Sequence, residues 1–131
     1  MSKKLILTTV LISLVILILG YIIIDSLNKK NQITVKVPPK NSIVYYYGLT
    51  CPHCHELDKW IKENKIEEKV KFEKKEVWYN KENAAELQKV AEFCRLDSSS
   101  IGVPFLWADG KCYIGTSDVE KILSEKSKIN K

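Results

Sequence analysis

Arginine is almost missing from this chain of 131 residues, although its formal net charge is +5 at pH 7. Arg95 is the one arginine, and lysines interleaved with glutamates supply the remaining positive charge. Planar guanidinium groups make many of the specific contacts to bases and phosphates, so this composition argues against a nucleic-acid partner. The sequence also lacks low-complexity stretches and internal repeats, and we expect one compact domain.

A cleavage motif is missing after the longest hydrophobic run, residues 5–24. A helix of this length spans roughly 30 Å at about 1.5 Å per residue, the thickness of a bilayer's hydrocarbon core. No small-x-small motif and no cysteine for a lipid follow it directly, which favours an uncleaved transmembrane signal anchor. Because the basic stub 1–4 precedes the run, we expect the amino terminus inside and the rest of the chain outside.

The remaining chain divides into a polar linker at 25–40 and a folded domain at 41–131. Residues 42–47 are β-branched and aromatic without polar alternation, which predicts a strand buried on both faces. The helices and strands that follow are predicted from local patterns. These are a proline or asparagine at a helix start, apolar periodicity, an Asp109-Gly110 turn and a capping box at 117–120. The predicted elements are a helix at 52–64, an edge strand at 70–73, a helix at 81–94, strands at 105–108 and 111–114, and a final helix.

The resulting order is β-α-β-α-β-β-α. Strands joined through a helix run parallel, whereas the last two strands form a hairpin. The sequence therefore predicts an α/β fold with a mixed four-stranded sheet and helices on both faces.

Two cysteines lie where the first strand gives way to a helix, in the motif Cys51-Pro52-His53-Cys54. The amino terminus of a helix carries a partial positive charge and unpaired N–H donors, which favour a thiolate over a thiol. Cys54 shares a helical stripe with Leu57, so we expect Cys54 to be buried and Cys51 to be exposed. Cys51 would then be the attacking or attacked sulfur, and Cys54 would resolve the mixed disulfide. His53 is expected to tune the thiolate.

The ligands that would make the motif a cofactor site are scarce. Cys51 to His55 match the c-type haem pattern, but the other candidates for an axial ligand are Met1, across the hydrophobic run, and His53, inside the motif. A zinc site usually has a second close pair of cysteines, which the sequence lacks. We therefore expect neither a metal nor a cofactor.

Two motifs of the domain resemble the thioredoxin superfamily: Cys51-Pro52-His53-Cys54 after a hydrophobic strand, and Gly102-Val103-Pro104-Phe105 before the hairpin. The resemblance covers about residues 42–126 and implies a three-layer thioredoxin-like fold. It also implies that Pro104 follows a cis peptide bond beside the redox pair, and that Val103 and Pro104 shape the substrate groove. The Pro-His dipeptide is similar to that of Dsb-type disulfide-forming oxidases, and Pro52 and His53 would tune the pair.

The sequence departs from the family at two points. Many members carry a buried carboxylate six residues before the first cysteine, where this chain has Tyr45. The helical insertion of the Dsb-type oxidases is missing too, and the short domain looks more like glutaredoxin or a minimal thioredoxin. The direction of electron flow therefore stays open.

The other two cysteines are single and widely spaced. Cys94 lies on the apolar stripe of its helix and Cys112 lies inside a strand, so we interpret both as small core residues. A second disulfide between them is the alternative, and it would suit an exported domain.

These features predict a membrane-tethered thiol–disulfide oxidoreductase that acts on protein thiols and disulfides. We expect a single-pass protein held in the bilayer by residues 5–24, with its catalytic domain outside the cytoplasm. A membrane redox partner would fit by analogy with the family. The alternatives are a non-catalytic tethered binding domain and, with less support, haem attachment at Cys51-x-x-Cys54-His55.

Overall fold

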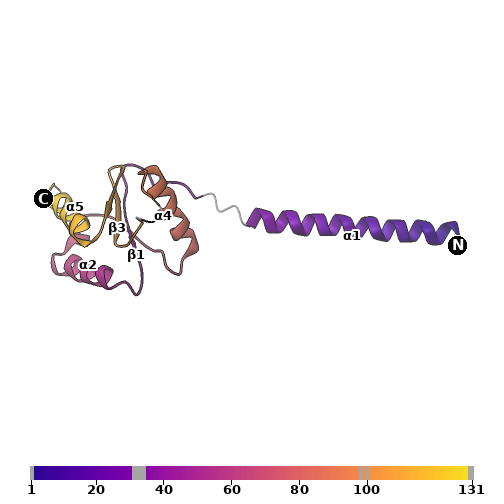
Figure 1. Ribbon diagram of the computed structural model, residues 1–131, viewed down its shortest axis with the longest axis horizontal. Coiled ribbons are helices and arrows are strands. Elements are labelled where there is room, and N and C mark those ends of the chain that lie inside the picture. Colours follow the sequence, from indigo (N-terminus) through magenta and orange to yellow (C-terminus); the bar gives the residue numbers. More distant parts are fainter. Residues whose placement is uncertain (1, 31–34, 98, 100, 130–131) are drawn as a thin grey trace. The chain divides into compact units, whose positions relative to one another are not determined.

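The computed structural model describes residues 2–30, 35–97, 99 and 101–129. The chain divides into two units, residues 1–34 and 35–131, and each is described by itself (Figure 1).

The described residues of the first unit contain one helix, α1 (Lys3–Lys30). It extends past both ends of the hydrophobic run, through Lys30. The stretch Lys3–Leu27 is long and apolar enough to cross a membrane, judged by length and composition. Its apolar side chains are exposed along the described helix, which is costly in water and favourable in lipid.

The second unit contains a four-stranded sheet with the strand order β2-β1-β3-β4. The strand β1 pairs in parallel with β2 and antiparallel with β3, and β3 pairs antiparallel with β4. This is the thioredoxin-like α/β fold with the expected mixed sheet. The elements are β1 (Ile43–Tyr47), α2 (Pro52–Glu63), α3 (Ile66–Lys69), β2 (Glu73–Glu76), α4 (Lys81–Phe93), β3 (Phe105–Ala108), β4 (Lys111–Ile114) and α5 (Thr116–Ile129).

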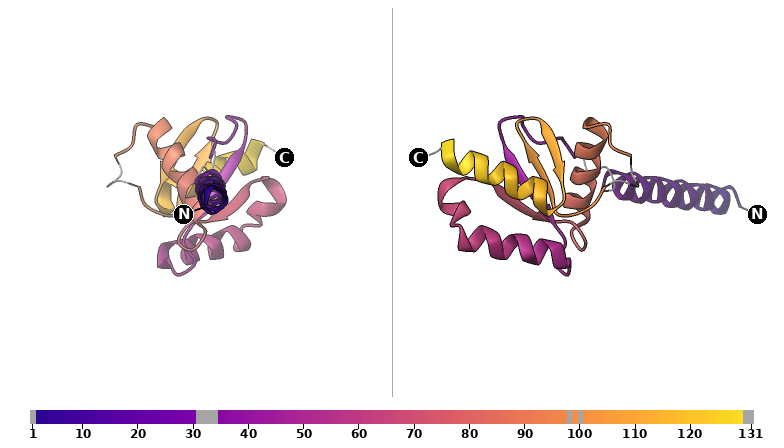
Figure 2. Two further views of the ribbon diagram at one scale, coloured as in Figure 1. Left: turned by 90° about the vertical axis from the view of Figure 1, so that its right-hand side faces the viewer. Right: turned by 60° about the vertical axis from the view of Figure 1, so that its left-hand side comes forward.

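Helices cover both faces of the sheet, with α4 on one side and α2 and α5 on the other (Figures 1 and 2). The core is divided into two clusters, one on each face of the sheet. Residues of β1 contribute to both, because successive side chains of a strand point to opposite faces. Val44 and Tyr46 join the cluster under α4, whereas Tyr45 joins the cluster under α2, α3 and α5. All three side chains are buried, as expected for a central strand.

The structure differs from the sequence prediction between α2 and α4. The alternating residues 70–73 do not form the edge strand, which lies at Glu73–Glu76 instead. Val70 ends the short helix α3, which the sequence did not predict, and its buried side chain packs into the core under α2. The apolar alternation at 70–72 therefore reflects core contacts made before the strand begins.

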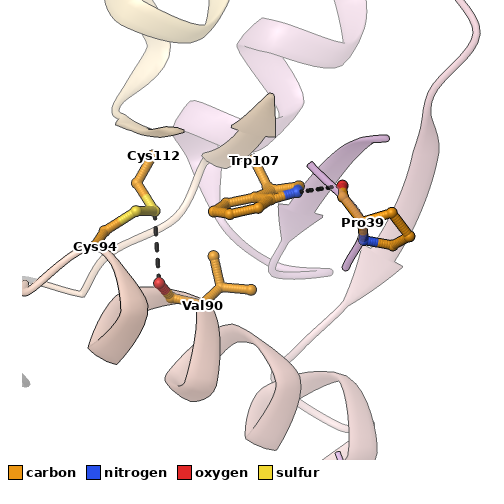
Figure 3. Close-up of a disulfide and its surroundings, with 5 residues drawn as sticks. All are labelled: Pro39, Val90, Cys94, Trp107 and Cys112. Atoms are coloured by element: carbon orange, nitrogen blue, oxygen red, sulfur yellow. Dashed lines mark hydrogen bonds between the residues drawn. A yellow bond between two sulfur atoms is a disulfide. The ribbon is translucent and has the colours of Figure 1, made fainter. Parts of the chain in front are cut away.

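A disulfide joins Cys94, at the carboxyl end of α4, to Cys112 in β4 (Figure 3). Our preferred interpretation of these two residues as unpaired core cysteines is therefore wrong. Trp107 packs on the same side of the sheet, and its indole nitrogen donates a hydrogen bond to the backbone oxygen of Pro39 at 3.0 Å. The end of the expected linker is thus part of the folded unit, where Val37 packs against the core.

Replacing Cys94 and Cys112 by alanine is expected to lower the free energy of unfolding of residues 35–131 by about 3 kcal/mol. The two cysteines are 18 residues apart in sequence, and opening a loop of that size restores conformational entropy to the unfolded chain. Urea denaturation of the double variant measures the loss. The matched control replaces Cys51 and Cys54, and a loss below about 1 kcal/mol in the test variant would contradict the prediction.

Candidate active site

The two cysteines of the motif flank the first turn of α2. Cys51 is the amino-terminal cap of the helix, in an extended conformation (φ −79°, ψ 115°). Its sulfur accepts a hydrogen bond from the backbone N–H of Cys54 at 3.3 Å. Pro52 occupies the first helical position, where its missing N–H needs no partner. The positive end of the helix therefore points at the Cys51 sulfur, as the sequence predicted.

The two cysteines differ less in solvent exposure than we expected. Cys51 is only 5% exposed and Cys54 is 1% exposed, so the expectation of an exposed Cys51 is wrong as stated. The Cys51 side chain instead lines a groove of about 580 Å³, which gives it access to solvent. The other lining residues are Val77, Trp78, Ala84, Leu87, Gln88, Ile101, Gly102 and Val103.

The loop before β3 forms the opposite wall of the site. The Val103–Pro104 peptide bond is cis, as the resemblance implied. The Cys51 sulfur lies 3.6 Å from the backbone oxygen of Val103, in the geometry of a weak hydrogen bond. Cys51 and Val103 are 52 positions apart in the sequence, and the pairing of β1 with β3 brings them together. The structure therefore places Val103 and Pro104 beside the cysteine pair.

The two histidines lie at the surface of α2. The His53 side chain is 72% exposed, and its Nδ1 lies 3.4 Å from a carboxylate oxygen of Glu56. His55 is exposed as well. The side-chain contact found for His53 is thus with a carboxylate of its own helix, and its effect on Cys51 stays a prediction.

Cys54 is held as a thiol by its surroundings. Burial, followed by a hydrogen bond from the Cys54 thiol to the Cys51 side chain and by the charge of Cys51, raises the pKa of Cys54 to about 12, although the Gly48 backbone and Tyr45 act in the opposite direction. At neutral pH the second sulfur therefore keeps its proton until its environment changes. Such a group is suited to resolving a mixed disulfide and poorly suited to starting the exchange.

Glu76 connects the turn before Cys51 to the wall of the groove, a role that the sequence did not reveal. Its carboxylate accepts hydrogen bonds from the backbone N–H groups of Leu49, Trp78, Tyr79 and Asn80 at 2.8–3.3 Å. Burial acts to raise the pKa of Glu76, but these four donors outweigh it and lower the pKa overall. The glutamate thus stays ionised and holds the segment after β2 beside the active-site turn.

The hydrogen bonds to the Glu76 carboxylate also hold Trp78 against Gly48. A β-carbon at Gly48 would overlap the indole ring, so glycine is required for this close approach. Trp78 lines the groove and remains 50% exposed. Apart from the glycine itself, no local pattern predicts this contact, because it depends on the ends of two neighbouring strands.

No family model and no curated protein matches the sequence. The structure is similar to a glutaredoxin from buckwheat in complex with glutathione, at 16% identity and a TM-score of 0.47, covering 79% of this chain and 83% of that one. It is also similar to holo glutaredoxin C1 from Populus tremula x tremuloides, at 12% identity and a TM-score of 0.46, covering 68% and 80%. A third similar structure is that of a thioredoxin-like protein, at 24% identity and a TM-score of 0.44, covering 63% of this chain and 91% of that one. TM-scores below 0.5 and identities of this size support no conclusion about activity. The thioredoxin-like fold is identified from the strand order and the element order.

The unequal environments of the two thiols predict unequal alkylation. In a Cys54→Ser variant, iodoacetamide should modify Cys51 readily at pH 8, because that side chain lines the groove. In a Cys51→Ser variant, Cys54 should react slowly at pH 8 and faster as the pH rises toward 12, because burial is the main cause of its raised pKa. Mass spectrometry of the folded protein measures both rates, and equal rates at pH 8 would contradict the assignment.

Proposed function

We propose that this chain is a thiol–disulfide oxidoreductase that exchanges disulfides with proteins through Cys51 and Cys54. In the reducing direction the Cys51 thiolate attacks a client disulfide. A bond forms between Cys51 and one client sulfur, and the other client sulfur leaves as a thiolate. Cys54 then loses its proton and attacks Cys51, which forms the Cys51–Cys54 disulfide and releases the second client thiolate. The client gains the two electrons that the pair loses, the proton from Cys54 is left for one of the two client thiolates, and the reverse sequence oxidises a client.

The observation that carries this proposal is the asymmetry of the pair. One sulfur caps a helix, accepts an N–H hydrogen bond and lines a groove. The other lies one turn along, almost fully buried, with a raised pKa. Attack by the first sulfur and resolution by the second follow from these environments. The electrons reside on the sulfurs themselves, so the exchange requires no cofactor.

A protein client fits the chemistry of the groove. Its nine lining residues, all in the described part of the chain, include no charged side chain. Leu49, Trp78 and Tyr79 are large, at least half exposed, and lie in the two segments that Glu76 joins. An extended apolar segment around a client cysteine would bury this surface on binding. Protein thiols and disulfides are therefore the proposed substrates.

The proposed location is the outer face of a membrane, with α1 as a single-pass anchor. The apolar length of α1 supports the anchor, and the basic residues before it support an internal amino terminus. The Cys94–Cys112 disulfide supports an oxidising compartment, because structural disulfides are rare in the cytosol. A redox partner within the same membrane would renew the Cys51–Cys54 pair after each exchange.

A Cys54→Ser variant should accumulate mixed disulfides between Cys51 and client proteins, because the sulfur that releases the client is gone. A Cys51→Ser variant should accumulate few, since Cys54 is buried and protonated. Non-reducing electrophoresis of the full chain, followed by peptide mapping, measures the adducts. Equal trapping by both variants would overturn the assignment of roles, and no trapping by either would favour a non-catalytic binding domain.

Topology mapping tests the location independently. A peptide tag at the carboxyl terminus of the full chain should be removed by protease added to cells whose membrane is intact and whose outer membrane face is accessible to the protease. A tag at the amino terminus should be protected until the membrane is lysed. The opposite pattern would place the cysteine pair in the cytoplasm and would contradict the proposed compartment.

A further inference from the structure

Tyr45 belongs to a cluster of polar side chains on the face of the sheet that carries α2. It pairs in register with Lys74 of β2, whose ammonium nitrogen lies 5.6 Å from the centre of the Tyr45 ring. The same nitrogen donates a hydrogen bond to Asp58 of α2 at 2.6 Å. Lys74 and Asp58 are 30% and 23% exposed, so their ion pair is partly shielded from solvent. A tyrosine, a lysine and a carboxylate thus meet where β1, β2 and α2 pack together.

The opposite face repeats this chemistry. Tyr46 pairs in register with Lys75, and its hydroxyl donates a hydrogen bond to Glu86 of α4 at 2.7 Å. Lys75 binds both carboxylate oxygens of Glu86 at 2.7 and 2.8 Å. Each face of the sheet therefore carries a tyrosine, a lysine and a carboxylate, related by the alternation of β1 and β2. Each lysine has one further neighbour: the Tyr47 ring centre lies 5.5 Å from the Lys74 nitrogen, and a Glu73 carboxylate oxygen lies 3.6 Å from the Lys75 nitrogen. The two sets offer a comparison within one molecule.

Of these two sets, the Tyr45 set contacts the redox pair. The Tyr45 hydroxyl donates a hydrogen bond to the backbone oxygen of Cys54 at 3.5 Å, and Tyr45 is one of the groups that lower the pKa of Cys54. Among the contacts described for Tyr46, none involves either cysteine. If tyrosines served only to fill the core and bind an ion pair, both sets would be equivalent. The contact with Cys54 distinguishes them.

The surroundings of Tyr45 keep its hydroxyl protonated. Burial, the charge of Cys54 and the charge of Asp58 all raise the pKa of Tyr45 well above its usual range, and Cys51 adds to the effect. The loop that faces Cys51 contributes Val103 and Pro104, neither of which titrates. The hydroxyl is therefore a permanent donor. The groups that act on the pKa of Cys54 are Cys51, which raises it, and the Gly48 backbone and this tyrosine, which lower it.

We propose that the Tyr45 hydroxyl is the hydrogen-bond donor that stabilises negative charge on the Cys54 sulfur whenever that sulfur attacks or leaves. Lys74 acts as a positioning residue, because it balances the charge of Asp58 beside the tyrosine. This inference rests on the proposed function. During resolution Cys54 gives its proton to solvent, its sulfur bonds to Cys51, and the client sulfur leaves as a thiolate. Tyr45 keeps its own proton throughout and lowers the cost of the charged intermediate.

A two-step reaction of the full chain, with Cys51 and Cys54 reduced, separates this inference from the proposed function. Dithiobis-nitrobenzoate is an aromatic disulfide whose released thiolate absorbs visible light. Attack by Cys51 releases the first thiolate, and attack by Cys54 on the mixed disulfide releases the second. Stopped-flow absorbance therefore reports the two sulfurs as two phases. An absent first phase in the unmodified chain would overturn the proposed function, and this inference with it.

Tyr45→Phe should leave the first phase unchanged and slow the second phase about tenfold at pH 7, as expected for a lost hydrogen bond to a charged group. The pH at which the second phase reaches half its maximal rate should rise, because one of the groups that lower the pKa of Cys54 is gone. Tyr46→Phe is the matched control and should change neither phase. Identical second phases in Tyr45→Phe and the unmodified chain would overturn the inference, as would equal slowing in both variants.

Lys74→Met, compared with Lys75→Met, gives a second test that does not depend on the folding of Tyr45→Phe. Both lysines are partly exposed, at 30% and 17%, and each pairs with a carboxylate. Loss of Lys74 leaves Asp58 uncompensated beside Tyr45, so the second phase should slow and its pH profile should move to higher pH. Loss of Lys75 leaves Glu86 uncompensated on the face that carries α4. It should change neither the rate of the second phase nor its pH profile. Equal shifts in both variants would overturn the positioning role.

Discussion

The hydrogen bond from the Cys54 N–H to the Cys51 sulfur is the contact on which the proposed chemistry depends. It exists because α2 begins at Pro52 and is held against the sheet by its buried stripe of Cys54, Leu57 and Ile61. That stripe fixes the rotation of the helix, and the rotation places one sulfur at the helix terminus and the other in the core. Packing along three turns of helix thus determines the electrostatics at its first residue.

The central strand β1 organises the rest of the site through its alternation. The face that carries α4 supports the groove, with Val77 and Leu87 belonging both to the core and to the groove lining. The face that carries α2 holds Cys54 above Tyr45. In the proposed function, client binding and resolution therefore lie on opposite faces of one sheet, and the Cys94–Cys112 disulfide links α4 to the face that it covers.

Local signals account for most of what the sequence predicted. The β-branched run of β1, the proline at the start of α2 and the Asp109-Gly110 turn each specify structure through neighbouring residues, and the sheet order follows from their sequence. The errors concern contacts between distant segments. The edge strand shifted to Glu73–Glu76 because pairing with β1 sets the register. Cys51 is more buried than expected because the loop before β3 packs against it, with the Val103 oxygen 3.6 Å from its sulfur. The disulfide could not be predicted without knowing that α4 ends beside β4.

Disulfide mapping after a single turnover tests the central claim most directly. The full chain, with Cys51 and Cys54 reduced, is mixed with a protein that contains one accessible disulfide, and both products are mapped by mass spectrometry. We predict one Cys51–Cys54 disulfide formed for each client disulfide reduced, with Cys94–Cys112 unchanged. A reduced client without a Cys51–Cys54 bond, or a Cys94–Cys112 bond that has been reduced, would contradict this prediction.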